Sequence, residues 1–281
     1  MTSSPDTPAA RAMRTAVRAA RAGGAAALPW YGRPGAELKA DDSPVTRADL
    51  AANDAILAVL AAEAPDDAVL SEESADRAER LGRTRVWIVD PLDGTREFIA
   101  QNGEFSVMVG LAVEGRAVAG AVYAPALELL MYAAERCGAW IEEGGAPPRP
   151  LRCGPAASPP RLVGSRSHAD PALERVRAVV GAGEVRVSGS VGLKCGLIAR
   201  GACDLYAHPV PYLKEWDTCA PEVVLREAGG TVTDCRGGPL RYNKERTAQP
   251  HGILAAGPLP AELLARVRAE LADAVLAGGA R

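Results

Sequence analysis

"WIVDPLDGTREFI", residues 87–99, is the stretch that decides the fold. Its apolar start predicts the end of a buried strand, and the run after Gly94 has the spacing of a helix. Two carboxylates, Asp90 and Asp93, therefore stand where a buried strand ends, with a proline stiffening the link between them. A plain turn does not need both carboxylates, so the pair indicates a functional site at the end of this strand.

The length and composition predict a large core that divides in two. At 281 residues and 48% apolar content, the chain has the size at which a single core begins to split. Residues 142–160 are rich in glycine and proline and show no period, as expected of a domain boundary. We expect an N-terminal α+β metal-binding domain over residues 1–146 and a C-terminal α/β substrate-specificity domain over residues 147–281.

Charge and cysteine content narrow the partners and the compartment. A net charge of -3 and a pI near 5.8 give the surface nothing that attracts nucleic acid or an acidic membrane. The N-terminal 30 residues contain no uninterrupted apolar span of membrane length. The six cysteines include no C-x-x-C pair. This favours free thiols without a metal or redox role over a disulfide framework or a zinc site. We expect a cytoplasmic protein, either a monomer or a homodimer.

Periodicity predicts the order of the elements. Helical spacing predicts helices over residues 8–27 and 46–63. Alternating apolar residues over 104–135 predict an antiparallel meander flanked by helices. After residue 160, strands and helices alternate as in an α/β fold, with one helix expected over residues 218–228. The apolar face of the 46–63 helix carries Leu50, Leu57 and Leu60.

Acidic residues cluster at three places, each beside an apolar run. Glu72 and Glu73 follow "VLS", Asp90 and Asp93 follow "WIV", and Asp217 lies in "KEWDT". Taken singly, these could be a helix cap, a turn and an N-cap at Asp217. Together they would repel by roughly 4 kcal/mol per adjacent pair at an effective dielectric of about 20, a penalty that divalent cations remove. All-oxygen ligation suits magnesium, with manganese as a substitute, and paired metals suit in-line displacement at phosphorus.

The residues after Asp93 fit phosphate binding. A helix that begins there would direct its free N–H groups at a bound phosphate. Gly94 would let the backbone approach closely. The pattern predicts phosphate hydrolysis on paired metals.

Three segments then resemble a known family. "VLSEES" at 69–74, "WIVDPLDGT" at 87–95 and "WDT" at 216–218 are similar to the signatures of the lithium-sensitive, magnesium-dependent phosphatases typified by inositol monophosphatase. The flanking "SRSHAD" at 165–170 and "EWDTCAPEVVLREAGGTVTDCRGGPLRYNK" at 215–244 more closely resemble the 3'(2'),5'-bisphosphate nucleotidases.

That resemblance implies a fold and an activity. The fold would be a layered α/β/α/β/α sandwich. The activity would be magnesium-dependent hydrolysis of adenosine 3',5'-bisphosphate to AMP and phosphate, and of PAPS to APS, by in-line attack of metal-activated water. The partner would be a small-molecule nucleotide, with two to three Mg²⁺ ions per site, Mn²⁺ as a substitute and Li⁺ as an inhibitor.

The resemblance also assigns roles to residues. The first metal would be held by Glu72, Asp90 and the carbonyl of Leu92. The second would be held by Asp90, Asp93 and Asp217, with Glu73 near a weaker third. Thr95 would contact the attacking water, and because its hydroxyl is a weak base, Asp49 would support it. Substrate contacts would come from Lys39, Gly94, Thr95, Ser167, His168, Gly189, Lys194 and Asp217.

Alternatives stay open at this point. Lys194 could instead extend along an apolar helix to solvent, and His168 could be a loop residue without a role. The chain could be an inositol monophosphatase or another sugar-phosphate phosphatase of the same superfamily. A non-catalytic metal or nucleotide sensor is a further alternative, although it would not need Thr95 and Asp49. In this family, the region of residues 74–85 can form a mobile flap.

Overall fold

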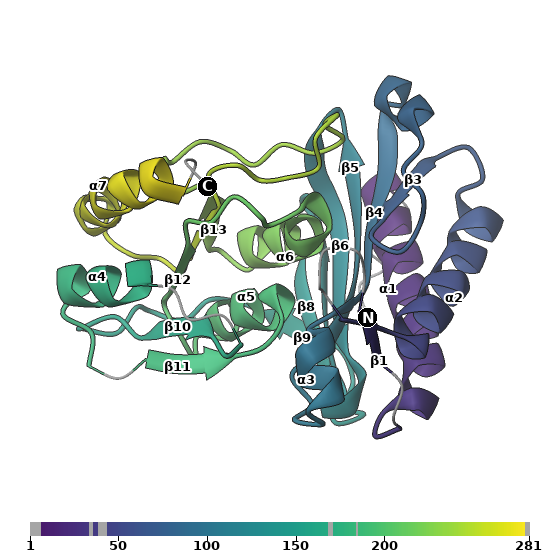
Figure 1. Cartoon of the computed structure of the whole chain (residues 1–281), viewed down its shortest axis with the longest axis horizontal. Coiled ribbons are helices and arrows are strands. Elements are labelled where there is room, and N and C mark those ends of the chain that lie inside the picture. Colours follow the sequence, from purple (N-terminus) through teal and green to yellow (C-terminus); the bar gives the residue numbers. More distant parts are fainter. Residues whose placement is uncertain (1–6, 34–35, 39–43, 168–170, 184, 279–281) are drawn as a thin grey trace.

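The chain folds into five layers in which helices and sheets alternate (Figure 1). A computed structural model describes residues 7–33, 36–38, 44–167, 171–183 and 185–278. Helices α1 and α2 cover one face of a seven-stranded sheet, and α5 and α6 separate it from a five-stranded sheet. Helices α4 and α7 cover the far face of the second sheet. This order confirms the predicted α/β/α/β/α sandwich.

The element bounds are as follows. The helices are α1 (Pro8–Ala27), α2 (Arg47–Glu63), α3 (Thr95–Ile99), α4 (Pro171–Val180), α5 (Val191–Ala199), α6 (Glu215–Glu227) and α7 (Ala261–Gly278), with 3₁₀ turns η1 (Leu28–Trp30), η2 (Ala78–Gly82) and η3 (Pro125–Leu127). The first strands are β1 (Ala36–Leu38), β2 (Pro44–Thr46), β3 (Ala68–Ser71), β4 (Arg85–Asp93), β5 (Ser106–Val113), β6 (Arg116–Ala124), β7 (Leu129–Ala134), β8 (Gly138–Glu143) and β9 (Arg149–Leu151). The later strands are β10 (Leu162–Ser165), β11 (Val185–Ser188), β12 (Leu205–His208), β13 (Thr231–Thr233) and β14 (Ile253–Ala256).

The seven-stranded sheet follows chain order from β3 to β9, with only β3 and β4 parallel. Along β4, Trp87 and Val89 pack toward α1 and α2, whereas Val86 and Ile88 pack into the middle layer of α5 and α6. This alternation is the period of two that a strand buried on both faces requires. Asp90, the next even position, therefore faces the middle layer.

The five-stranded sheet has the order β11-β10-β12-β14-β13, with β10, β11 and β12 parallel. Their carboxyl ends lie at one edge, and ligands bind at such edges in open α/β sheets. The chain passes from the first sheet to the second between Leu151 and Leu162. The division into domains at residue 146 stays a prediction.

Helix α6 lies unusually close to the seven-stranded sheet. Gly110 of β5 and Gly120 of β6 are cross-strand partners. A Cβ at Gly120 would come within 2.7 Å of Ala220 Cα, and one at Gly110 within 2.6 Å of Cys219 Sγ. Only glycine leaves room for this approach. The paired glycines thus let α6 lie against the sheet at Cys219 and Ala220, directly after the turn that carries Asp217.

Two sequence predictions about helices are wrong. Helix α6 begins at Glu215, not Thr218, so Asp217 is not the N-cap but lies in the first turn, where its Oδ2 accepts the Lys214 N–H at 2.6 Å. Leu50 is 51% exposed, because α2 buries a different face. The residues that α2 buries are Ala48, Asp49, Ala52, Asn53, Ile56 and Leu60. Strands β1, β2, β8, β9 and β14 and helix α7 lie outside the elements that the sequence predicts.

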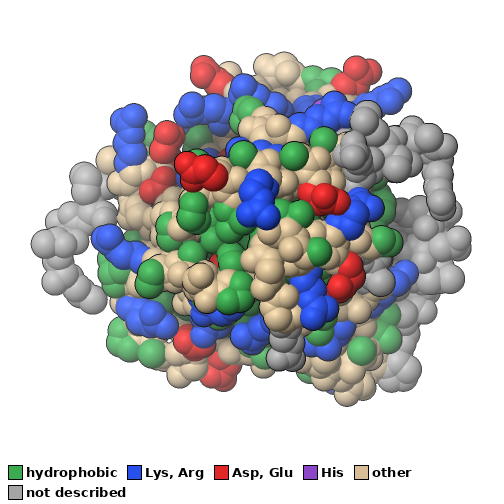
Figure 2. Space-filling view, turned by 90° about the vertical axis from the view of Figure 1, so that its left-hand side faces the viewer, with side chains coloured by type: hydrophobic (Ala, Val, Ile, Leu, Met, Phe, Trp, Pro, Cys, Tyr) green, Lys and Arg blue, Asp and Glu red, His purple; other side chains and the backbone are tan. Residues whose placement is uncertain are grey.

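Helix composition and surface charge were predicted to be those of a protein without long apolar helices or a strongly basic surface. Within the described ranges, no helix combines the length and the apolar content needed to cross a membrane. Figure 2 shows the end of the molecule that carries α4 and α7, where basic and acidic side chains are interspersed.

Asp204 anchors the segment that enters the second sheet. Its carboxylate accepts the Arg161 backbone N–H at 2.7 Å and the guanidinium Nε and Nη2 at 2.9 Å each, and it is 2% exposed. Burial alone raises the pKa of Asp204, but the side-chain and backbone hydrogen bonds of Arg161 outweigh it, so the pKa lies below its ordinary value.

We predict that Asp204→Asn lowers the free energy of unfolding. The Arg161 side chain is 43% exposed, so solvent screening should limit the loss to about 1–2 kcal/mol. Because the folded pKa is depressed, the contribution is present above the unfolded pKa, near 4, and is lost as pH falls through the folded value. Urea denaturation at pH 7 and below pH 4 measures this, with the exposed Asp66→Asn as control. An equal difference from wild type at both pH values would contradict the assignment.

Candidate active site

A β-bulge places Asp90 and Asp93 on the same face of the sheet. Asp90 pairs with Met108 and Asp93 with Ser106, so three steps along β4 match two along β5. Without the extra residue, side chains three positions apart would point to opposite faces. Proline has no N–H for the ladder and is tolerated at bulges, which explains Pro91 between the two carboxylates.

Asp217 of α6 completes the cluster. One carboxylate oxygen each from Asp90, Asp93 and Asp217 lies within 4.8 Å of the others. Asp90 is 1% exposed and accepts the Leu92 N–H at 3.0 Å. The structure thus brings together three of the predicted metal ligands from two distant parts of the chain.

The electrostatics of this cluster are unfavourable without a cation. Burial raises the pKa of Asp90 well above its ordinary value, and the charges of Glu72, Asp93 and Asp217 raise it further. Burial likewise raises the pKa of Asp217, with added repulsion from Asp93 and Glu72. Glu72, which follows β3, is therefore electrostatically part of the same site.

Asp93 is held by groups from α5. Its Oδ2 accepts the Ser190 hydroxyl at 2.6 Å and the Gly192 N–H at 3.3 Å. Burial raises the pKa of Asp93, and the Lys194 charge partly offsets this. Ser190 also lies 2.8 Å from the hydroxyl of Ser106, which ties α5 to β5.

Asp49 and Thr95 meet beside the cluster. Thr95 Oγ1 lies 3.3 Å from Asp49 Oδ1 and 3.3 Å from the carbonyl oxygen of Leu92. Asp49 Oδ2 accepts the backbone N–H and the hydroxyl of Thr46 at 2.7 and 2.6 Å, a capping box that begins α2. Burial raises the pKa of Asp49 despite these bonds. The capping box therefore fixes which oxygen of Asp49 faces Thr95.

Gly94 and α3 shape the turn after the cluster. Gly94 has a φ of 96°, which side chains with a Cβ rarely adopt, and a Cβ there would lie 3.1 Å from the Glu104 carbonyl oxygen. Helix α3 spans only Thr95–Ile99. Glu73 follows Glu72 after β3 and is half-buried.

Two of the predicted substrate residues lie at the carboxyl edge of the second sheet. Ser167 follows β10 and donates its hydroxyl to Glu97, which is 4% exposed. Gly189 follows β11 and donates its N–H to Glu104 Oε2 at 2.8 Å. Lys39 and His168 lie outside the described residues.

Lys194 is a buried cation and does not extend to solvent. It is 3% exposed, and its Nζ donates to the Gly189 carbonyl oxygen at 3.2 Å and lies 5.4 Å from the ring centroid of Tyr206. Burial lowers its pKa, while the nearby charge of Asp93 raises it. The structure thus rules out the alternative that Lys194 extends along its helix to solvent. It places the positive charge of Lys194 close enough to Asp93 for the two charges to interact.

Sequence reasoning missed three residues of this site. Glu97 and Glu104 orient Ser167 and Gly189, and no local pattern distinguishes them from surface acids. Ser190 is the N-cap of α5, where its hydroxyl accepts the Leu193 N–H at 3.2 Å. A serine ahead of a helix is a known cap signal, so the pattern could have revealed Ser190.

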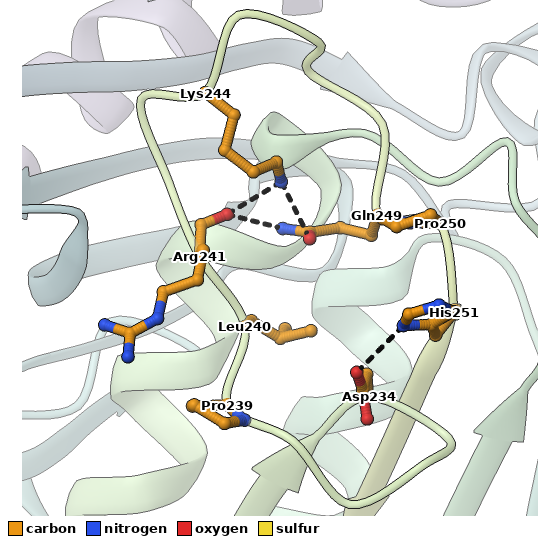
Figure 3. A pocket seen from close by; sticks show the side chains of 9 residues that line it. Asp234, Pro239, Leu240, Arg241, Lys244, Gln249, Pro250 and His251 are labelled. Atoms are coloured by element: carbon orange, nitrogen blue, oxygen red, sulfur yellow. Dashed lines mark hydrogen bonds and ion pairs between the residues drawn. The ribbon is translucent and has the colours of Figure 1, made fainter.

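A cavity of about 180 Å³ is lined by residues of the segment between β13 and β14 (Figure 3). Its polar groups bond one another: Lys244 Nζ lies 2.9 Å from Gln249 Oε1, and His251 Nδ1 lies 3.2 Å from Asp234 Oδ2. None of its lining residues belongs to the carboxylate cluster, so we place the reaction at the carboxylates.

The residues present fit hard divalent cations. The cluster offers only oxygen donors, and like charges gathered by burial need a counter-charge that Lys194 alone does not supply. Oxygen-only sites of this charge suit Mg²⁺ or Mn²⁺ rather than zinc or copper.

Known proteins match most of the chain. The model of the inositol monophosphatase family matches residues 10–273. Over 205 residues, 73% of this chain, the sequence is 45% identical to the 3'(2'),5'-bisphosphate nucleotidase CysQ of Shigella flexneri, 81% of which is covered. The nucleotidase of the same name from Escherichia coli strain K12 is 44% identical, with the same coverage.

Solved structures of this family have the same fold as this chain. CysQ from Bacteroides thetaiotaomicron superposes with a TM-score of 0.76 at 36% identity, covering 88% of this chain and 98% of that one. An IMPase from Thermotoga maritima gives a TM-score of 0.76 at 24% identity, covering 94% and 99%, a likeness of fold alone.

We predict that Asp217→Asn stabilises the metal-free protein and weakens its response to metal. Removing one charge relieves the repulsion, so the melting temperature in chelator should rise by about 2–4 °C for each kcal/mol gained. The rise in melting temperature on adding Mg²⁺ should shrink, because a ligand is lost. Calorimetry with the exposed Asp54→Asn as control measures both. A lower melting temperature in chelator would show that the carboxylates do not repel as argued.

Proposed function

The chain belongs to the inositol monophosphatase family, and from this premise we propose that it is a 3'(2'),5'-bisphosphate nucleotidase. It would hydrolyse the 3'-phosphate of adenosine 3',5'-bisphosphate to AMP and phosphate, and that of PAPS to APS. The observation that carries the proposal is that the carboxylate cluster meets the carboxyl edge of the second sheet. There the Ser190 hydroxyl donates a hydrogen bond to Asp93, and the charge of Lys194 acts on the same carboxylate.

The relatives support this substrate class. The nucleotidases from Shigella flexneri and Escherichia coli are 45% and 44% identical over 73% of the chain. A span of 205 residues in a chain of 281 necessarily includes residues 77–205, and therefore Ser167 and Lys194. A buried lysine is a compact point charge suited to a phosphate-bearing ligand.

The cluster would hold the cations that assist the reaction. Glu72, Asp90 and the Leu92 carbonyl would hold one, and Asp90, Asp93 and Asp217 a second, with Glu73 near a weaker third. Two such cations supply charge neutralisation and water activation. We propose Mg²⁺, with Mn²⁺ as a substitute and Li⁺ as an inhibitor.

Thr95 and Asp49 would handle the proton of the attacking water. Thr95 Oγ1 has one proton, directed at Asp49 Oδ1 or the Leu92 carbonyl, and its lone pairs can accept a hydrogen bond from water. A proton passing to Thr95 Oγ1 would release the hydroxyl proton to Asp49 Oδ1. The raised pKa of the buried Asp49 favours that transfer.

Two other activities compete with this one. Inositol monophosphate or another sugar phosphate would use the same carboxylates, and solved IMPases share the fold. A sensor would need the carboxylates but not the Asp49–Thr95 pair. A cytoplasmic location also belongs to the proposal, and the six free cysteines support it.

We predict that adenosine 3',5'-bisphosphate is the preferred substrate. Phosphate release should be at least about tenfold faster in kcat/KM than with inositol 1-phosphate or fructose 1,6-bisphosphate, because Ser167, Gly189 and Lys194 match positions that the resemblance to the nucleotidases assigns to nucleotide binding. Release should stop when EDTA removes the metal. A phosphate assay with all three compounds measures this. Preference for inositol 1-phosphate would keep the metal site but overturn the nucleotide assignment, and no release at all would favour the sensor.

We predict that Asp49→Asn lowers kcat by about 10²- to 10⁴-fold, the range that general base catalysis contributes. KM should change little, because Asp49 acts through Thr95. Thr95→Ser retains the hydroxyl and serves as the matched control. Steady-state kinetics at saturating Mg²⁺ measure both variants. Near-normal turnover of a folded Asp49→Asn would remove Asp49 from the mechanism.

A further inference from the structure

Arg80 and Glu215 are buried charges that the proposed reaction does not use. Arg80 is 3% exposed and lies in η2, in the segment that leads from Glu72 back to β4. Glu215 is 0% exposed and is the first residue of α6, two positions before Asp217. A buried charge is costly unless it is well bonded, so the partners of these two are informative.

Asn243 joins the two charges. Arg80 Nη1 donates to Asn243 Oδ1 at 2.9 Å, and Asn243 Nδ2 donates back to the Arg80 carbonyl oxygen at 2.9 Å. On the other side, the backbone N–H groups of Asn243 and Lys244 donate to the two oxygens of Glu215 at 2.6 and 2.9 Å. Arg80 Nη2 also donates to the Lys244 carbonyl oxygen at 3.0 Å. We call Arg80, Asn243 and Glu215 the Asn243 network.

The loop that carries Asn243 is itself cross-linked. Figure 3 shows Lys244 Nζ directed at the Arg241 carbonyl oxygen and at Gln249 Oε1, at 2.8 and 2.9 Å, while Gln249 Nε2 donates to the same carbonyl at 3.2 Å. The Thr247 carbonyl accepts the Glu215 N–H at 2.9 Å. The loop can therefore hold η2 and α6 at a set separation. In Figure 1 it extends from the second sheet to the top of the first.

We propose that the Asn243 network is a positioning device that holds the segment of Glu72 in place against Asp217, so that the cation site is assembled before a cation binds. The inference rests on the proposed function. Glu72 begins a segment, residues 72–84, whose regular structure is the single turn η2. Like charges on Glu72 and Asp217 push that segment away from α6, and the network opposes this push. The segment expected from family resemblance to form a flap is thus tied to the second half of the chain.

The sharpest test is Asn243→Gly. Asn243 has a φ of 57°, which glycine adopts without strain, and the backbone N–H bonds to Glu215 remain. The variant removes the side-chain links of Asn243 to η2 and its end, which are the two bonds with Arg80 and the bond from Nδ2 to the Arg83 carbonyl oxygen at 3.3 Å. The dissociation constant for Mn²⁺, from electron paramagnetic resonance titration without substrate, should rise about 10- to 100-fold, the usual effect of removing support for metal ligands. The Mg²⁺ concentration for half-maximal activity should rise in parallel, whereas kcat at saturating Mg²⁺ and KM should hold within about threefold.

A second variant and a control complete the experiment. Arg80→Lys keeps the charge but cannot reach Asp76, Asn243 and the Lys244 carbonyl together, so it should weaken Mn²⁺ binding in the same direction. Arg83→Lys, at an exposed neighbour, should leave Mn²⁺ affinity unchanged.

Two results would overturn the proposal. One is wild-type Mn²⁺ affinity in folded Asn243→Gly and Arg80→Lys, and the other is a lowered melting temperature with no change in affinity, which would make the network merely structural. Because the titration needs no substrate, a failure of the nucleotidase activity would be seen separately from a failure of the network.

Discussion

The mutual repulsion of carboxylates in the middle layer is the constraint on which the rest of the structure depends. Asp90, Asp93 and Asp217 bring oxygens within 4.8 Å of one another in a place where burial has removed much of the solvent. No fold would gather them for stability, because each carboxylate raises the free energy of the others. Their convergence therefore has to be imposed by packing and backbone geometry elsewhere, and it implies a cationic ligand.

Several local features impose that convergence. The bulge in β4 turns two carboxylates toward one layer, and the paired glycines of β5 and β6 let α6 bring the third. The capping box of α2 and the N-cap of α5 then orient Asp49 and Ser190, which face Thr95 and Asp93. Each helix start thus performs two tasks: it satisfies its own backbone donors and presents a side chain to the site.

The two halves of the chain are joined through polar contacts as well as through apolar packing. Arg166 pairs with Glu104 through two hydrogen bonds of 2.6 and 2.7 Å, and Arg80 bonds to the loop before β14. Such contacts are directional, so they fix the relative placement of groups more narrowly than apolar surfaces do. A site built from distant segments needs that accuracy, because a small misplacement changes metal ligation and reactivity.

The sequence by itself determined the residue types, the order of most helices and strands, the family resemblance and the acidic positions, because these depend on local periodicity and composition. Only the tertiary structure decided which side chains share a face. A plain strand would separate Asp90 from Asp93, and the bulge that unites them depends on the register with β5. The apolar period of α2 indicated Leu50, yet packing buried Asp49 and Asn53. No sequence pattern indicated a role for Asn243. Its partners Arg80 and Glu215 lie 163 and 28 residues away in the chain and contact it only once the layers pack.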